Sequence, residues 1–439
     1  MGELIELSNQ VEHRKKYRYS LYNHKLIANN GEVYERHFIV IKNKFGIIVH
    51  FTKLHNYVGV YDDKVFAPLT SDAETKLRYV CMMLNYVLAT NYDKFHIDHI
   101  FKISKESLGC FFRDYAQEML ANGEYRSQQS VEKCVYAVAM FFRKLRHKFG
   151  GHMLLHESDF ITETTVFDKR GRQRVKKIPA FQVKGFPKQK NIFRELPTKA
   201  FQLLLSLAFR YSPDIVFAIC LQAFAGLRAG EVMSVRQEGS PLGNGLIFTY
   251  FEGEVRKIEI DLTKELPLRS DGVICAKIKK ERRQCVYPPF LNAFYQAYKH
   301  HKHFLSGKKF EAEYCPMFIN TKGLAMTYDD YSRRFTSLIE NHFRSELLES
   351  DNLECRIYGQ LLYENKLSSH VLRHWFSVQL VLCGEDIAQI QYWRGDKSPE
   401  SALNYLQNKG DLVKELETAN DLFAGIITTL GELEMSKRI

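Results

Sequence analysis

The stretch that decides the fold is Ser369-His370-Val371-Leu372-Arg373-His374-Trp375, in the last fifth of the chain. Ser368 or Ser369 suits the cap of a helix that begins at about His370, and on that helix His370 and Arg373 project from one face because they are three positions apart. Arg394-Gly395-Asp396 follows, and then Tyr405. This order of a histidine, an arginine and a tyrosine, with a second arginine upstream, is the strongest signal in the sequence.

The helix boundaries downstream of this stretch are also readable. Gly384 suits the end of the first helix, and Gly395 suits the end of a second helix over Glu385–Trp393. Ser398-Pro399-Glu400 combines a capping serine, a first-turn proline and an acid. We therefore predict a third helix, with Tyr405 two turns into it.

The residue types suit chemistry at a phosphodiester. Upstream, Gly226-Leu227-Arg228-Ala229-Gly230-Glu231 supplies a further arginine. Arg228 and Arg373 can hold one phosphate through planar, permanently charged guanidinium groups. His370 can handle a proton, and the Tyr405 hydroxyl can attack phosphorus. These parts suffice to cut and rejoin a DNA strand without a metal ion, ATP or another cofactor.

These motifs resemble those of the tyrosine recombinases, also called phage-type integrases. The matches are H-x-x-R at His370 and Arg373, G-L-R-x-x-E at 226–231, and a tyrosine nine residues after Asp396. The resemblance covers about 190–420. It implies that the two arginines clamp the scissile phosphate, that Tyr405 forms a 3′-phosphotyrosine with a free 5′-hydroxyl, and that His370 assists proton movement. We assign Glu231 to structure, as a partner of Arg228.

The resemblance also implies a general-acid lysine on a β-hairpin, here 274–283. Lys277 and Lys279 share one face of the predicted strand because side chains alternate with a period of two. Lys279 is preferred because it is nearer the turn. The alternative is that both lysines only contact backbone phosphates.

Asp396 departs from the family pattern, in which a histidine or tryptophan donates a hydrogen bond to the phosphate. An ionised aspartate only accepts hydrogen bonds and repels a phosphate. Three readings compete: Asp396 turns away and bonds His370, Arg373 or Arg394; Lys397 supplies the missing donor; or the enzyme is slow or inactive.

Length and composition set the broad class. A chain of 439 residues predicts two or three domains, and a hydrophobic content of 45% with 13% aromatic residues argues against disorder. The net charge of +11 favours a polyanionic partner, with nucleic acid first and an anionic membrane surface second. The sequence has nine cysteines without a C-x-x-C pair, and it shows neither a signal peptide pattern nor a long apolar run. These features predict a cytoplasmic, nucleoid-associated protein without membrane contact.

Four regions follow along the chain. We predict a β-rich N-terminal extension over 1–70 with a hairpin at 42–45, a helical region over 71–150, an irregular basic connector over 151–190, and a mixed α+β region over 191–439. The fold class is therefore multidomain and mainly α, with a small antiparallel β-sheet in the last region. The resemblance implies that 71–150 is a core-binding DNA domain, that 191–439 is the catalytic domain, and that the two form a clamp around DNA. Strands of the catalytic domain are predicted over 246–251, 256–262, 272–279 and 282–287.

Two basic tracts are candidates for DNA binding. The helix that begins near Ser127 ends in Arg143, Lys144, Arg146 and Lys148, although a basic end also suits the helix dipole. Between Lys169 and Lys190 there are nine lysines or arginines and no acid, which a solvated linker would not require. From this tract Arg172, Arg174, Lys176 and Lys177 are predicted to neutralise backbone phosphates.

The tail suggests assembly. Apolar residues recur at three- and four-residue steps over 413–430, as on a narrow helix stripe. The stripe suits packing on its own domain, whereas the resemblance implies docking on a neighbouring protomer, with a monomer free in solution, a tetramer on double-stranded DNA and accessory DNA-bending proteins. The favoured role is integrase or transposase of a mobile element. A type IB topoisomerase and a non-catalytic DNA-binding protein of the same fold are the alternatives.

Overall fold

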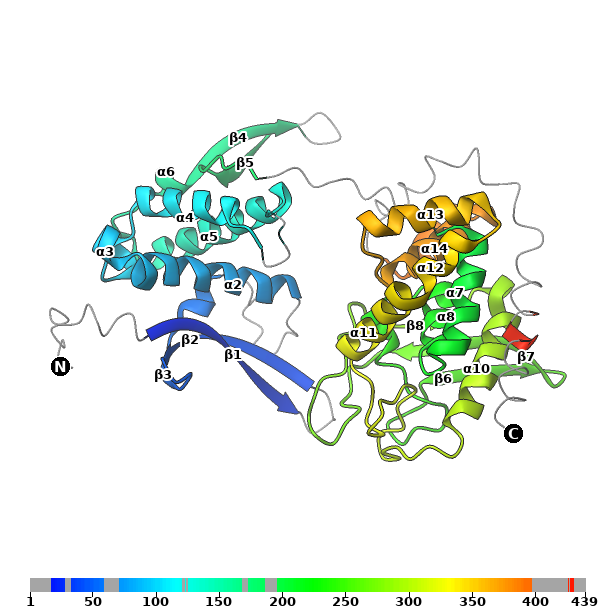
Figure 1. Cartoon of the computed structure of the whole chain (residues 1–439). Coiled ribbons are helices and arrows are strands. Elements are labelled where there is room, and N and C mark those ends of the chain that lie inside the picture. Colours follow the sequence, from blue (N-terminus) through cyan, green and yellow to red (C-terminus); the bar gives the residue numbers. More distant parts are fainter. Residues whose placement is uncertain are drawn as a thin grey trace. The chain divides into compact units, whose positions relative to one another are not determined.

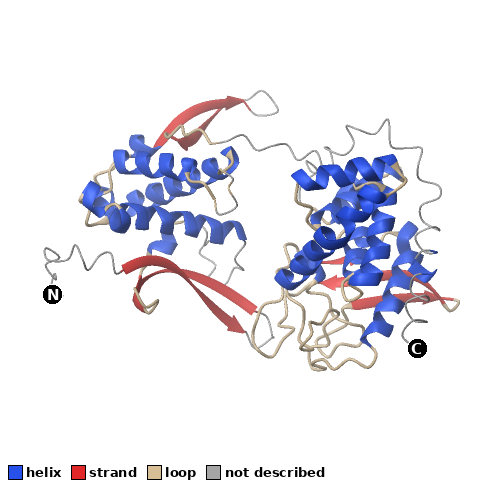
Figure 2. Ribbon diagram, viewed as in Figure 1, coloured by secondary structure: helices blue, strands red, loops and turns tan. Residues whose placement is uncertain are grey.

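The chain folds into two compact units, each with its own core (Figure 1). The computed structural model describes residues 17–27, 33–58, 71–120, 123, 125–167, 173–185, 196–396, 425 and 427–429. The first unit contains the described residues up to 185, and the second contains those from 196 onward. Helices dominate both units (Figure 2).

The first unit consists of helices between two antiparallel β-structures. Its helices are α2 (Ser71–Asn85), α3 (Tyr92–Phe95), α4 (Lys105–Gln117), α5 (Gln128–Phe149) and α6 (Glu157–Phe160). Its strands are β1 (Tyr17–Ile27), β2 (Val33–Asn43), β3 (Ile48–Phe51), β4 (Ile161–Phe167) and β5 (Gln173–Pro179). The sheet β1-β2-β3 lies against α2, and the β4–β5 hairpin lies on the other side of the helices (Figure 1).

The sheet and the helices of this unit share one core. Ile39 of β2 is fully buried in the same apolar cluster as Leu77 of α2 and Phe142 of α5. The side-chain amide of Asn85 fastens β1 to α2, because it accepts from the Tyr19 backbone N–H and donates to the Tyr19 carbonyl, both at 2.8 Å. The predicted boundary at residue 70 therefore marks the change from strands to helices. It does not divide two domains, because the strands and the helices share one core.

The β4–β5 hairpin corrects the prediction of irregular structure in the basic connector. Seven consecutive residue pairs, from Ile161 with Pro179 to Phe167 with Gln173, form an antiparallel ladder. Isoleucine, threonine and valine, which favour strands, fill most of β4. Of the basic residues that suggested a linker, Arg174, Lys176 and Lys177 therefore lie on a strand, β5.

The second unit consists of helices, which pack mainly on one another, and one three-stranded sheet. Its helices are α7 (Thr198–Tyr211), α8 (Val216–Ala225), α9 (Ala229–Val232), α10 (Leu291–Leu305), α11 (Tyr328–Leu338), α12 (Arg344–Glu349), α13 (Leu353–Glu364), α14 (His370–Leu382) and α15 (Ile387–Arg394). Its strands are β6 (Leu246–Phe251), β7 (Glu254–Leu262) and β8 (Arg282–Cys285), in the order β6-β7-β8 and all antiparallel. Short 3₁₀ or π turns connect several elements of both units: Leu54–Tyr57, Tyr86–Thr90, Ile100–Lys102, Gly150–His152, Pro288–Phe290 and Ile339–Phe343.

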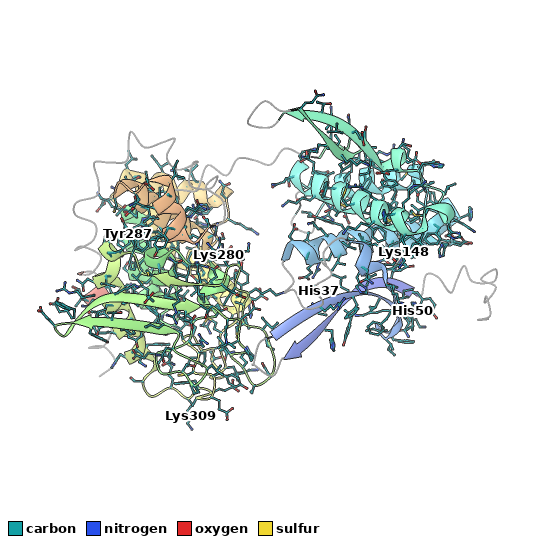
Figure 3. The ribbon with its side chains drawn as sticks, turned by 180° about the vertical axis from the view of Figure 1, so that it is seen from behind. His37, His50, Lys148, Lys280, Tyr287 and Lys309 are labelled. Carbon is teal, nitrogen blue, oxygen red and sulfur yellow. The ribbon has the colours of Figure 1, made fainter. Side chains whose placement is uncertain are left out.

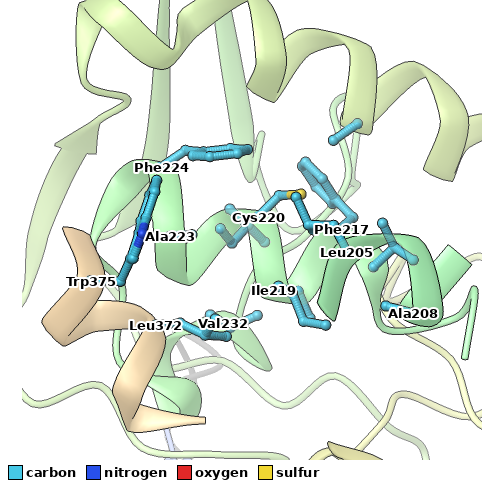
Figure 4. Packing of buried hydrophobic residues seen from close by; sticks show 14 of the residues in the cluster. Leu205, Ala208, Phe217, Ile219, Cys220, Ala223, Phe224, Val232, Leu372 and Trp375 are labelled. Carbon is cyan, nitrogen blue, oxygen red and sulfur yellow. The ribbon is translucent and has the colours of Figure 1, made fainter. Parts of the chain in front are cut away.

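The central contact of the second unit is between α8 and α14. Every residue of α8 is buried, and Trp375 of α14 packs with its ring centroid 4.4 Å from that of Phe201 and 6.2 Å from that of Phe224. Figure 4 shows Leu372 and Trp375 of α14 turned toward α8. This apolar contact fixes the start of α14, which carries His370 and Arg373, beside the end of α8.

The predicted strand over 272–279 is wrong. Other partners take up backbone groups of this segment: the Ile278 N–H donates to Glu265 Oε2 at 3.1 Å, and the Cys275 carbonyl accepts from the Tyr328 N–H at 2.7 Å. Of the predicted 282–287 strand, Arg282–Cys285 forms β8, and the Val286 N–H also donates to the Ile258 carbonyl of β7 at 3.0 Å. Lys277 and Lys279 therefore lie on an irregular segment before β8 rather than on a shared strand face.

Three further expectations can be compared with the described residues. All nine cysteines are free thiols. Among the described residues, no helix is long and apolar enough to cross a membrane. Of the apolar stripe in the tail, Ile427 is buried in the core of the second unit, whereas Val413, Leu416, Asn420, Phe423 and Leu430 lie outside the described residues.

Candidate active site

The turn after α8 presents Arg228. Gly226 ends α8 with φ of 64°, in the left-handed region, and a Cβ there would lie 2.5 Å from the ring of Phe376. Leu227 is fully buried, so the next residue, Arg228, points away from the core and begins α9. Its backbone N–H donates to Glu231 Oε2 at 3.0 Å, and its Nη1 donates to Glu231 Oε1 at 2.9 Å.

Arg373 ties three segments of the chain together. Its guanidinium is 1% exposed, and it donates to the Gly226 carbonyl, to the Arg394 carbonyl at 2.8 Å and to Asp396 Oδ1 at 2.6 Å. The glycine turn therefore positions both arginines: it presents Arg228 and accepts a hydrogen bond from Arg373.

Arg228 and Arg373 converge on one oxygen atom. Asp396 Oδ1 accepts a hydrogen bond from Nη2 of Arg228 and from Nη2 of Arg373, each at 2.6 Å. The other carboxylate oxygen, Oδ2, lies 3.1 Å from Nε of Arg394. We call Arg228, Arg373 and Arg394 with Asp396 the anion cradle. An oxygen held between two guanidinium groups is the arrangement that a phosphate oxygen would adopt.

A second layer holds the cradle in place. Glu231 is fully buried and accepts from Arg282 at 3.1 and 2.9 Å in addition to its bonds with Arg228. Arg282 also donates to Gln284 Oε1 at 2.8 Å, and the Gln284 amide donates to the Trp393 carbonyl at 2.7 Å. The strand β8 is therefore linked to both α9 and α15. The carbonyl of Lys280, labelled in Figure 3, accepts a further bond from Arg282 at 2.9 Å.

Gly395 is required where α15 meets this layer. Its φ is 62°, and a Cβ there would lie 2.3 Å from Nε of Arg282. Because the residue is a glycine, the chain can turn sharply past Arg282 and direct Asp396 into the cradle.

The charges of the site favour an anion. Burial alone would raise the pKa of Glu231, but its hydrogen bonds to Arg282 and the charges of Arg282 and Arg228 outweigh burial and lower the pKa to about 2. Burial and the neighbouring charges of Arg228 and Arg394 lower the pKa of Arg373 to about 9, which still leaves it a cation at neutral pH. Four guanidinium groups thus face two carboxylates, so the site keeps a positive surplus.

His370 is held in its neutral form. Its side chain keeps exposed surface, but dense protein around the imidazole and the charges of Arg373, Arg394, Arg228 and Lys279 lower its pKa to about 4. A neutral imidazole can accept a proton at physiological pH. Lys279 makes the smallest of these contributions to the lowered pKa.

Of the remaining residues predicted to take part in catalysis, the structure describes Lys277 alone. Lys277 is half-buried, and its carbonyl lies against Gly230 in the α9 turn. Tyr405 and Lys397 lie outside the described residues. Their roles stay predictions from the sequence.

Four of the eight predicted DNA-binding residues line a hollow of about 840 Å³ in the first unit. Arg143, Lys144, Arg146 and Lys177 line it together with Lys76, and among the described residues Glu157 is its one carboxylate. Lys177 Nζ pairs with Glu157 Oε1 at 2.9 Å, and Nη1 of Arg146 donates to the Leu155 carbonyl at 2.5 Å.

The rest of the predicted basic set lies along α5 and β5. Lys148, labelled in Figure 3, is exposed near the end of α5, and Lys176 is exposed on β5. Arg172 and the side chain of Arg174 lie outside the described part of the chain.

Sequence reasoning missed two residues of the site. Arg282 lay inside the quoted hairpin, and Arg394 was considered only as a partner of Asp396. The signal for Arg394 was its place directly before a helix-ending glycine, since basic residues favour the last helical turn. Nothing local in the sequence distinguishes Arg282 from Arg283, because its role depends on contacts with α9 and α15.

Comparison with known proteins identifies the fold. The chain is similar to the Tn1549 transposon integrase in complex with a circular intermediate DNA, with a TM-score of 0.50 at 14% identity over 80% of this chain and 94% of that chain. It is also similar to the XerH site-specific recombinase bound to difH substrate (TM-score 0.45, 15% identity, 76% of each chain) and to a lambda integrase dimer bound to a COC′ core site (TM-score 0.45, 13% identity, 83% of this chain and 98% of that chain). No protein-family model and no curated protein matches the chain. The likeness to the Tn1549 integrase confirms the predicted tyrosine-recombinase fold.

Proposed function

We propose that the chain is a site-specific DNA recombinase of the tyrosine class, which cuts and rejoins DNA strands through a covalent 3′-phosphotyrosine. The observation that carries the proposal is the convergence of Arg228 and Arg373 on one oxygen, although they are 145 positions apart in the sequence. Two buried or half-buried guanidinium groups aimed at one point make a receptor for an oxyanion, and they suit the charge that develops on a phosphodiester during cleavage.

The proposed reaction balances without a cofactor. The phenolic oxygen of Tyr405 attacks phosphorus, a bond from that oxygen to the 3′-phosphate forms, and the bond from phosphorus to the 5′-oxygen breaks. His370, whose lowered pKa keeps the imidazole neutral at pH 7, accepts the phenolic proton. Lys279 donates a proton to the leaving 5′-oxygen, with Lys277 as the second choice. The reverse steps, with a new 5′-hydroxyl, rejoin the strand.

The first unit is proposed to hold the DNA. The lysines and arginines around the hollow beside α5, and the exposed Lys176 on the β4–β5 arm, suit contacts with backbone phosphates. Such contacts give affinity without sequence preference, so the target sequence has to be read by other groups. Assembly into a tetramer on DNA and service of a mobile element as integrase or transposase belong to this proposal.

A specific observation favours a second candidate, a DNA-binding protein of the same fold without catalytic activity. The carboxylate of Asp396 occupies the point between the two arginines where a phosphate oxygen would bind. If that carboxylate never leaves, DNA can bind along the basic surface while no strand is cut.

A suicide substrate separates these two functions. Duplexes made from the DNA that flanks the gene would carry a nick close to each candidate cleavage position. Cleavage then releases the short fragment that bears the new 5′-hydroxyl, and its loss traps the adduct. We expect a covalent protein–DNA band that survives denaturation with the native chain and with Tyr392→Phe, in which a tyrosine 66% exposed at the end of α15 is changed. The Tyr405→Phe variant is expected to lose it. Specific binding of a duplex with no adduct in any variant would favour the non-catalytic function.

A further inference from the structure

The carboxylate of Asp396 uses the nitrogen atoms that an incoming phosphate would need. Both bonds to Oδ1 come from Nη2 atoms, at 2.6 Å each. The other terminal nitrogens serve the fold: Nη1 of Arg228 donates to Glu231, and Nη1 of Arg373 donates to the Gly226 carbonyl. An oxyanion that binds between the two arginines therefore competes with Asp396 for the same two donors.

We propose that Asp396 is an internal counter-ion that holds the arginine pair assembled and must be displaced by the substrate phosphate. The identity of that phosphate, a DNA phosphodiester, rests on the proposed function. The competition itself does not, because it can be measured with a simple oxyanion. In this view Asp396 is a positioning residue and a brake on the site, rather than a group that takes part in the chemical step.

The charge balance makes such an exchange feasible. Arg228, Arg373 and Arg394 are brought together around Asp396, and without an anion their positive charges would repel one another. A phosphodiester carries one negative charge, as an ionised aspartate does. Exchange of one for the other leaves the total charge of the cradle unchanged, so the arginines keep their arrangement through the substitution.

The second carboxylate of the site is not displaceable in the same way. Glu231 is fully buried, lies within the first turn of α9 and receives four hydrogen bonds from Arg228 and Arg282. Asp396 is 11% exposed and follows the left-handed Gly395 after the end of α15, rather than lying within a helix. Glu231 is therefore a buried structural partner of Arg228, whereas Asp396 contacts the same arginine from its more accessible side.

Sulfate binding to the full-length protein tests the competition directly. Asp396→Asn keeps the size of the side chain and removes its charge, and we expect the variant to bind sulfate at least about tenfold more tightly than the native chain in calorimetric titration. A matched control is Asp214→Asn, which removes a carboxylate paired with Arg334 near the opposite end of α8. The control is expected to bind sulfate as the native chain does.

Two further variants control for misfolding and for the place where the sulfate binds. Asp396→Ser removes the carboxylate with a smaller side chain, and it is expected to tighten sulfate binding as well, so the result does not depend on one variant that misfolds. In the double variant Arg228→Ala with Asp396→Asn, the tighter binding should disappear, because one arm of the cradle is gone. This result would assign the sulfate to the cradle rather than to the basic hollow of the first unit.

The outcomes distinguish this inference from the proposed function. Unchanged or weaker sulfate binding in both neutral variants would overturn the counter-ion, even if the native chain forms a covalent DNA adduct. Tighter sulfate binding supports the counter-ion, even if no adduct forms with any DNA. Where adducts do form, we expect them to accumulate faster with Asp396→Asn than with the native chain, and an adduct rate lowered more than about tenfold would overturn the role as a brake.

Discussion

Replacement of Glu231 by glutamine tests whether the second layer holds the cradle together. The carboxylate is fully buried and is the shared acceptor of Arg228 and Arg282, which come from α9 and β8. Glutamine has nearly the same shape but no charge, and its amide nitrogen brings a donor toward guanidinium groups that also donate. Glu231→Gln therefore leaves two arginines without their common counter-charge while it leaves no cavity.

The size of the effect follows from the pKa. The folded protein lowers the pKa of Glu231 from 4.5 to about 2, since the bonds and charge of Arg282 and the charge of Arg228 outweigh burial. At about 1.4 kcal/mol per pKa unit, the ionised form is favoured by about 3 kcal/mol relative to the unfolded chain. Removal of one partner of a buried ion pair costs about 3 to 5 kcal/mol, which agrees. For a unit of this size we expect Tm to fall by about 6 to 12 °C.

Urea denaturation at a series of pH values provides the assay. Because the folded pKa lies below the unfolded pKa, the stability from Glu231 is fully present above pH 4.5 and is lost as the pH falls toward 2. Glutamine does not titrate, so the gap between the native chain and Glu231→Gln should be widest at neutral pH and should close over this window. The control Glu254→Gln changes an ion pair in which the glutamate is 72% exposed, and it should cost less than about 1 kcal/mol. A gap under about 1 kcal/mol at pH 7, or one that does not close on acidification, would refute the reasoning.

Three further predictions concern the geometry of the site. Gly226→Ala should destabilise the second unit by about 2 kcal/mol or more in a denaturant titration, because the added methyl group clashes with the Phe376 ring and alanine is strained at a left-handed φ. The control Gly384→Ala also places alanine at a left-handed φ but has open space around it, so it should show the backbone strain alone. Adduct formation that depends on His370 should stay level from pH 8 to 6 and fall only as the pH approaches 4, whereas an inflection near 6.5 would contradict the lowered pKa. Lys279→Ala should raise the pKa of His370 in an NMR titration, and equal shifts in Lys277→Ala would remove the distinction between the two lysines.

The parts of the fold that rest on local signals are predictable from the sequence. Ser127 does cap α5, α14 does begin at His370, and glycine does end α15 at Gly395, because capping and left-handed termini depend on a few neighbouring residues. The pairing of His370 and Arg373 on one helix face follows from helical geometry in the same way. These signals put the arginines and the histidine on named elements before any tertiary contact is known.

The errors arise where backbone partners come from distant segments. The 272–279 segment alternates apolar and polar residues as a strand does, but the Glu265 side chain and the Tyr328 backbone N–H take up hydrogen bonds that a neighbouring strand would have made. The basic connector was predicted to be irregular from its charge and its prolines and glycine, although most residues of β4 favour strands. The place of Arg282 beneath Glu231 depends on three elements that meet only in the folded chain.

Asp396 illustrates how a departure from a family pattern becomes informative only with geometry. From the sequence, an acid at this position meant a missing donor and a repelled phosphate. One of the three readings had Asp396 turn away and bond His370, Arg373 or Arg394, and the contacts with Arg373 and Arg394 are present. In the structure its carboxylate lies between the two arginines and satisfies them. An acid that only weakened the site would have no reason to be aimed at its centre. The carboxylate of Asp396 would repel a phosphate bound beside it. Without a bound phosphate, the same carboxylate offsets the mutual repulsion of the three guanidinium groups, which need an anion among them whether or not the substrate is present.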